Sequence, residues 1–179
     1  MLLSYLELIE LVETGVIDAD PANVNGASID LTLDHRLLCE TPQTYLQPID
    51  LKEKQLPTFT PYTIRDDGYD LWPGRFVLAN TRETFNLPND IAAEFKLKSS
   101  VARAGLNHLL AGFADPGWHH AKLTLELHNV LTHHIIKLRE GMKIGQMIFY
   151  RVHPVPDEHS YSIKGRYNHT TVVTASKGV

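Results

Sequence analysis

Short segments with the composition of β-strands, separated by turn-forming residues, run through the second half of this chain. The turn signals include Trp-Pro-Gly at residues 72–74 and Asp-Pro-Gly at residues 115–117. Many short strands at such spacing are typical of an all-β sandwich or barrel. The sequence therefore predicts a mainly β fold, with strands expected at residues 76–79, 91–97, 122–130, 134–138 and 143–152.

The N-terminal region predicts one helix and one strand. Ser4 and Glu7 form a capping box, and apolar residues follow at helical spacing, so we expect a helix over residues 4–14. Residues 28–33 alternate between polar and apolar side chains, as a strand with one buried face does. Asp30 lies on the polar face of this segment, and we expect it to point to solvent.

Residues 40–70 differ in composition from the rest of the chain. They contain four prolines and few long apolar runs, which predicts a loop-rich insertion with short strands at most. They lack the Gly/Ser-rich composition of a linker between domains. At 179 residues the chain has the length of one domain, so residues 1–179 are expected to form a single domain.

The charge balance argues against one class of function. The chain has 17 lysine and arginine residues against 21 aspartate and glutamate residues, for a formal net charge of −4. Broad binding of nucleic acid needs a basic footprint, so no nucleic-acid partner is expected. We also expect no membrane partner and no signal peptide, because no apolar run is long enough and acidic residues interrupt the N-terminal segment.

Cysteine and histidine content bears on metal sites. Cys39 is the only cysteine, which rules out a disulfide within the chain and a thiolate zinc site, and a reducing, cytoplasmic setting is expected. Ten histidines include adjacent pairs at residues 119–120 and 133–134. Adjacent residues of a strand face opposite sides, so neither pair is expected to chelate a metal ion.

Residues 98–106, Lys-Ser-Ser-Val-Ala-Arg-Ala-Gly-Leu, place a cation, two hydroxyls, an arginine and a helix stop close together. Ser99 or Ser100 is expected to cap a short helix, whose free N–H groups and positive dipole end favour an anion. Arg103 follows one turn later, where its guanidinium can bind phosphate through two hydrogen bonds. The stretch predicts a phosphate-binding turn; the alternative is a capped surface helix with ordinary charges.

Two further segments hold candidate chemistry. Residues 123–128 alternate strictly, with Glu126 among the polar side chains, and a glutamate in a partly dry place can shuttle protons. The strand alone favours the alternative, an exposed glutamate on a solvent-facing sheet. In the turn at residues 115–118, Asp115 can accept a hydrogen bond from a sugar hydroxyl while Trp118 packs on the ring; the alternative is ordinary turn chemistry.

Four motifs, in order, carry a resemblance to a known family. They are Lys-Ser-Ser-Val-Ala-Arg-Ala-Gly-Leu at 98–106, Ala-Gly-Phe-Ala-Asp-Pro-Gly-Trp at 111–118, Leu-Thr-Leu-Glu-Leu at 123–127 and Glu-Gly-Met-Lys-Ile-Gly-Gln at 140–146. Together they resemble successive motifs of the dCTP deaminase family, which is related to the trimeric dUTPases. The resemblance covers most of the chain outside the proline-rich insertion.

This resemblance implies a fold, an assembly and a reaction. The fold is a distorted jelly-roll β-barrel of the dUTPase-like type, in a homotrimer with sites at subunit interfaces and a C-terminal tail, about residues 156–179, that closes over the site. The reaction is hydrolytic deamination of dCTP to dUTP and ammonia in pyrimidine deoxynucleotide metabolism, with Mg²⁺ on the triphosphate and no zinc. The signature of zinc deaminases, His-x-Glu with Pro-Cys-x-x-Cys, does not occur in the sequence.

The matching motifs also imply roles for single residues. Glu126 is the general acid/base that takes a proton from a water attacking C4 of cytosine and delivers protons to N3 and the leaving amine. Arg103 orients the water or the base, Ser99 is a further catalytic group, and His108 stands where the family places a histidine near the site. Asp115 holds the deoxyribose 3′-hydroxyl. The implied nucleotide-binding residues are Lys98, Ser99, Ser100, Arg103, Ala111, Asp115, Thr124, Leu125, Glu126, Tyr161, Arg166 and Thr170.

Departures from the family pattern leave alternatives open. The chain has one extra residue at positions 119–120, and Thr170 stands where the family has a triphosphate-binding glutamine. Residues 111–113 are Ala-Gly-Phe, a sequence typical of bifunctional family members. These members go on to hydrolyse dUTP to dUMP and diphosphate. The alternatives to plain deamination are this bifunctional activity, a dUTPase only, and a non-catalytic nucleotide-binding trimer.

Overall fold

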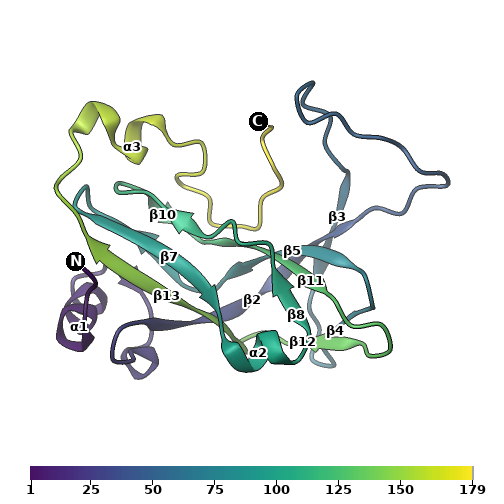
Figure 1. The fold of residues 1–179 in the computed structure, drawn as a ribbon, viewed down its shortest axis with the longest axis horizontal. Coiled ribbons are helices and arrows are strands. Elements are labelled where there is room, and N and C mark those ends of the chain that lie inside the picture. Colours follow the sequence, from purple (N-terminus) through teal and green to yellow (C-terminus); the bar gives the residue numbers. More distant parts are fainter. Residues whose placement is uncertain (179) are drawn as a thin grey trace.

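A computed structural model describes residues 1–178 of this chain (Figure 1). Its helices are α1 (Tyr5–Glu13), α2 (Ser99–Arg103) and α3 (Tyr161–Lys164), with 3₁₀ turns at Pro21–Asn23 and Asp157–His159. The strands are β1 (Ile17–Asp18), β2 (Ile29–Glu40), β3 (Phe59–Thr63), β4 (Tyr69–Leu71), β5 (Phe76–Thr81), β6 (Thr84–Asn86), β7 (Ile91–Leu97), β8 (Leu106–His108), β9 (Phe113–Ala114), β10 (His119–Ala121), β11 (Thr124–Asn129), β12 (Ile136–Leu138) and β13 (Lys143–Arg151).

Most strands belong to one large curled sheet. Its strand order is β8-β11-β5-β2-β13-β7-β9, with β3 added beside β2. β2 is 12 residues long; its first residues pair with β13 and its later residues with β5. The register shifts in both pairings, and such irregularities bend a sheet. Two smaller sheets, β1-β6-β10 and β12-β4, complete a mainly β, barrel-like fold, which confirms the prediction.

The apolar core joins the strands of the large sheet to α1. Leu125 and Leu127 of β11 are fully buried, and Leu8 and Leu11 of α1 pack into the same cluster. Burial of each such side chain is worth about 1.5–3 kcal/mol relative to exposure. The leucines therefore anchor one face of β11 and leave Thr124, Glu126 and His128, each half-buried, on the other.

Two local expectations are wrong. Asp30 does not point to solvent: it is 4% exposed, because β2 lies in the middle of the large sheet and lysines from other elements close over the carboxylate. Neither Ser99 nor Ser100 caps α2; Lys98 occupies the N-cap position without a side-chain hydrogen bond. The predicted helix stop is confirmed, because Gly105 just after α2 has a φ of +86°.

The insertion and the tail lie at the edges of the molecule. Between β2 and β3 the chain forms a long arm that reaches away from the large sheet (Figure 1). The tail follows β13, forms α3, and then runs along β10, where His169 N–H donates to the carbonyl of His119 (3.2 Å) and Lys122 N–H to that of Thr170 (2.8 Å). No helix within residues 1–178 has the length and apolarity that a membrane crossing requires.

Candidate active site

Glu126 and His108 face each other on neighbouring strands. β11 pairs with β5 on one side and with β8 on the other, and β8 brings His108 opposite Leu127. His108 Nε2 lies 3.0 Å from Glu126 Oε2, with side-chain exposures of 3% and 23%. The ring of Phe95 packs on His108 with centroids 4.6 Å apart. The Glu126 side chain is therefore shielded on one side and open on the other. It is not the exposed glutamate on a solvent-facing sheet that the strand alone favoured.

His108 Nε2 and Glu126 Oε2 form no well-aligned hydrogen bond. Although the atoms are close, they lack the alignment of a hydrogen bond, and neither has another partner among the residues that the structure describes. Buried polar atoms without a well-formed hydrogen bond are uncommon, and they often belong to functional groups. The pair is thus a candidate for proton transfer.

The predicted phosphate-binding turn is tied to β2 by an ion pair. Asp30 accepts hydrogen bonds from Lys98 Nζ (2.6 Å), Lys143 Nζ (3.0 Å) and Asn25 Nδ2 (3.0 Å). Burial works to raise the pKa of Asp30, but these three hydrogen bonds outweigh it and hold the pKa of the carboxyl below its ordinary value. Lys98 is consequently neutralised within the chain, which differs from a lysine left free for phosphate.

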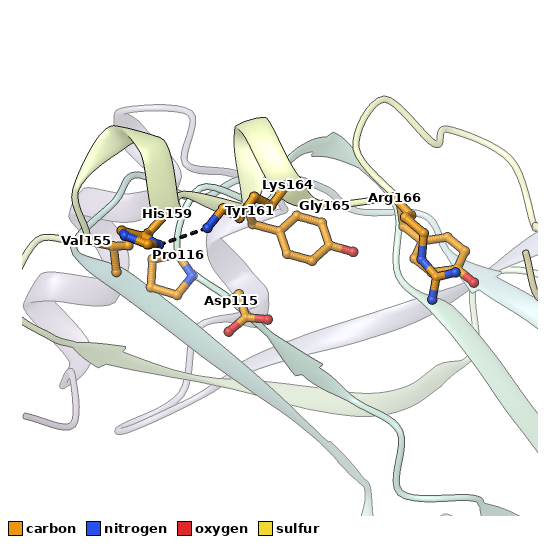
Figure 2. Close-up of a pocket in the computed structure, with 9 residues that line it drawn as sticks. Asp115, Pro116, Val155, His159, Tyr161, Lys164, Gly165 and Arg166 are labelled. Atoms are coloured by element: carbon orange, nitrogen blue, oxygen red, sulfur yellow. Dashed lines mark hydrogen bonds between the residues drawn. The ribbon is translucent and has the colours of Figure 1, made fainter. Parts of the chain in front are cut away.

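A pocket of about 450 Å³ lies between the turn after β9 and the tail (Figure 2). Asp115, Tyr161 and Arg166, all predicted site residues, line it. Burial raises the pKa of the Tyr161 phenol. Figure 2 shows Arg166 on the far side of Tyr161 from Lys164, whose Nζ lies 2.9 Å from His159 Nδ1. The pocket therefore offers cationic groups on both sides of a phenol.

Sequence reasoning missed Lys164 and His159, which also line this pocket. They lie in single helical turns too short to produce a periodic pattern. Trp118 does not take the role proposed for it: it is buried against Phe85, with ring centroids 5.1 Å apart, so it cannot pack on a sugar ring. Its indole N–H instead donates to the carbonyl of Tyr167 (3.2 Å) and so holds the tail.

One chain does not bring all predicted site residues together. α2 lies at the opposite end of the molecule from α3, so Ser99, Ser100 and Arg103 are remote from the tail pocket (Figure 1). These three side chains are exposed and make no hydrogen bond within residues 1–178. Leu125 is fully buried, and the remaining predicted residues are a half-buried Thr124, an exposed Ala111 and a half-buried Thr170 beside Lys122.

The comparison with protein families is decisive. A family model described as dCTP deaminase-like matches residues 2–152. This chain belongs to the dCTP deaminase-like family. The match ends before the tail, so part of the pocket wall lies outside the matched region.

Relatives in the family share much of the sequence. A protein of Bifidobacterium longum (strain DJO10A), named "dCTP deaminase, dUMP-forming", is 40% identical over 175 residues, which cover 94% of this chain and 88% of the relative. A protein of Mycobacterium ulcerans (strain Agy99) with the same name is 37% identical over 171 residues, covering 92% and 87%.

A solved structure supports the fold alone. The 2′-deoxycytidine 5′-triphosphate deaminase from Agrobacterium tumefaciens superposes with a TM-score of 0.66 at 20% sequence identity. The match covers 88% of this chain but only 50% of that chain, so this protein spans half the length of its structural relative.

Proposed function

We propose that this protein converts dCTP to dUMP, ammonia and diphosphate by deaminating the base and then hydrolysing the triphosphate. The observation that carries the proposal is Glu126, half-buried and 3.0 Å from the buried His108 in a member of the dCTP deaminase-like family. Two relatives are named dUMP-forming. Their names support the bifunctional alternative. The resemblance had implied a different outcome, in which dUTP is released.

Glu126 would carry the proton transfers of the deamination step. Its carboxylate takes a proton from water as the oxygen attacks C4 of cytosine and delivers it to N3. It then takes the proton of the new C4 hydroxyl and delivers it to the amine, which leaves as ammonia while the C4 carbonyl forms. One water is consumed for each dCTP deaminated. His108 would hold the carboxylate in place, because its ring is buried against Phe95 and has little freedom to move. The second step consumes another water and releases diphosphate.

Mg²⁺ is proposed as the ion bound with the triphosphate. Within residues 1–178, three candidate ligand atoms converge only at Asp34, His35 and Glu140, none of which is a predicted site residue. Asp30 is no free ligand, since lysines occupy both its oxygens. The predicted site residues therefore do not supply a set of protein ligands for the ion. This suits a Mg²⁺ that is held by phosphate oxygens and water, the usual mode for this ion with nucleotides. When bound, the ion would neutralise phosphate charge.

We also propose that the site is completed between chains of a homotrimer. α2, whose Ser99, Ser100 and Arg103 are exposed, lies at one end of a chain, and α3, whose residues line the tail pocket, lies at the other (Figure 1). The segment after α2 exposes apolar side chains, with Leu110 89% and Phe113 63% exposed. Exposed apolar groups of this size, close together in sequence, mark contact surfaces. In this proposal a neighbouring chain covers them, and the completed site combines Arg103 of one chain with Glu126 of another.

Mixed oligomers test the shared site. Arg103→Ala and Glu126→Gln chains are each expected to be inactive alone. Co-expressed in equal amounts, they recover about a quarter of wild-type activity, because at random mixing one interface in four combines the two intact halves. Recovery no greater than the sum of the separate variants would show that each site lies within one chain, while leaving the reaction itself in place.

Product analysis tests the reaction. Wild-type protein incubated with dCTP and Mg²⁺ is expected to yield dUMP and diphosphate without accumulating dUTP. Accumulation of dUTP would establish plain deamination instead. Hydrolysis of added dUTP with no turnover of dCTP would establish a dUTPase only, and binding without turnover of either nucleotide would establish a non-catalytic trimer.

A further inference from the structure

Three histidines from two distant segments meet where the tail crosses β10. The ring centroid of His169, from the tail, lies 4.8 Å from that of His119 and 5.6 Å from that of His120. The backbone fixes this approach, because His169 N–H donates to the carbonyl of His119. We call these three residues the histidine cluster. It lies on the protein surface, with His120 and His169 exposed.

Backbone geometry explains how two adjacent histidines reach the same partner. In a regular strand the two rings would face opposite sides. His120 has a φ of +51°, and the pairing of β10 with β6 shifts register between His119 and Ala121. The alternation therefore fails at this point. His119 and His120 are therefore not forced to opposite faces, which removes the reason for expecting this pair not to chelate a metal ion.

The ring of His119 is oriented as in many metal sites. Its Nδ1 lies 2.9 Å from the carbonyl oxygen of Gly117, so the tautomer that donates this hydrogen bond leaves Nε2 with a free lone pair. Histidine ligands of metals usually donate their other ring N–H in this way, to a carboxylate or a backbone carbonyl. The arrangement supplies one fixed ligand and its orienting partner.

The spacing of the rings suits a single ion. On a tetrahedral Zn²⁺ with Zn–N distances of about 2.0–2.1 Å, imidazole centroids lie roughly 5 Å apart. The two measured separations lie on either side of that value. The three nitrogens do not yet converge, but exposed rings such as those of His120 and His169 turn about χ2 without displacing packed neighbours.

The other cluster of potential ligands is less available. Asp34, His35 and Glu140 place three ligand atoms within 4.8 Å of one another. However, Asp34 already pairs with Lys122 Nζ at 2.7 Å, and its other oxygen accepts from the backbone N–H of His35. A cation would have to displace an ammonium group there, whereas the histidine cluster carries no such competitor among its contacts.

We propose that the histidine cluster binds one divalent transition-metal ion, Zn²⁺ or Ni²⁺, and that this ion fastens the tail to β10. Imidazole suits ions of this class, and water would fill the remaining coordination position. The metal would hold the tail closed, because His169 follows Arg166 and Tyr167, which line the tail pocket. This proposal does not depend on the proposed function.

Binding of the metal alone tests the site. Tag-free protein titrated with ZnCl₂ or NiCl₂ in a calorimeter is expected to bind one ion per chain. His169→Asn and His120→Asn each remove a ligand, and asparagine tolerates the left-handed backbone at both positions. Each variant should bind at least tenfold more weakly, while His133→Asn, in the other adjacent pair, should bind as the wild type does. Wild-type affinity in His169→Asn, or an equal loss in His133→Asn, would overturn the site.

Proteolysis tests the fastening. Trypsin can cleave the tail after Lys164, Arg166 and Lys177. Zn²⁺ is expected to slow tail cleavage in the wild type, EDTA to reverse the effect, and His169→Asn to show no effect of the ion. Tail cleavage that does not respond to Zn²⁺ in the wild type would contradict the role of the ion in holding the tail.

Discussion

The two ends of the candidate site are held in different ways. Glu126 lies on β11, which hydrogen-bonded strands flank on both sides, and it faces an almost fully buried His108. The tail pocket has one wall made of short helical turns, attached by hydrogen bonds that are spread along the segment, such as those from Trp118 to the carbonyl of Tyr167 and from Tyr161 N–H to the carbonyl of Pro116. A continuous ladder of bonds resists opening, whereas bonds that are spread along a segment open at lower cost.

This contrast suggests a division of labour. Proton transfer needs groups held within a fraction of an ångström, which strands provide better than loops. In the proposed function, capture and release of a nucleotide need a wall that opens, and the tail would provide it. Changes at the strand-held end should therefore lower kcat, and changes at the tail-held end should raise KM.

The largest effect is expected from Glu126→Gln. Glutamine keeps the shape of the side chain but cannot take a proton from water, so kcat for dCTP deamination should fall by about 10²–10⁴-fold. Nucleotide binding, measured by calorimetry, should stay close to that of the wild type. Glu94→Gln on β7 is the matched control, because Glu94 is also a half-buried strand glutamate but contacts Lys96 and Tyr150. A normal deamination rate in Glu126→Gln would refute the role of this carboxylate.

A smaller loss is expected from His108→Asn. The shorter side chain cannot reach Glu126, so the carboxylate loses its neighbour and kcat should fall roughly 10- to 100-fold through misplacement. The pH profile of kcat should change shape as well, which a merely structural residue would not cause. Circular dichroism and thermal unfolding establish that the variant is folded. An unchanged pH profile with reduced stability would assign His108 to packing alone.

The strand that carries Glu126 could be predicted from sequence, although the strand alone favoured an exposed glutamate, and the tail could be predicted only in part. Strict alternation in residues 123–128 fixes which side chains share a face with Glu126, because a strand has a period of two. Nothing local shows that Lys98 and Lys143 converge on Asp30, since these residues are 68 and 113 positions away along the chain. Lys164, in a single turn, and His120, at positive φ, break the regular patterns that sequence reasoning uses.

Asp30→Asn tests the ion pair that joins β2 to the predicted phosphate-binding turn. The folded-state pKa of Asp30 is below its unfolded value of about 3.9, so the folded protein binds fewer protons there. Its contribution to stability is therefore full above about pH 4 and is lost as pH falls through the folded-state pKa. Asp30→Asn should lower the free energy of unfolding at neutral pH by about 1–3 kcal/mol, since both lysines are partly exposed and can regain water.

Denaturant unfolding at several pH values measures this effect. The difference in unfolding free energy between wild type and Asp30→Asn should shrink as the pH falls below 4. A difference that is constant with pH would mean that the amide substitution acts through packing rather than through charge.

The smallest effect is expected from Tyr161→Phe at the tail-held end. The Tyr161 phenol lies in the pocket between Lys164 and Arg166 (Figure 2). If it donates to a phosphate oxygen of the nucleotide, its loss removes one hydrogen bond and should raise KM for dCTP by about 3- to 10-fold. kcat should stay unchanged, because Glu126 and His108 are untouched. Tyr5→Phe on α1 is the control, an exposed phenol outside the pocket. A fall in kcat without a change in KM would place Tyr161 with the reacting groups, and the distinction between a chemical end and a capturing end would then fail.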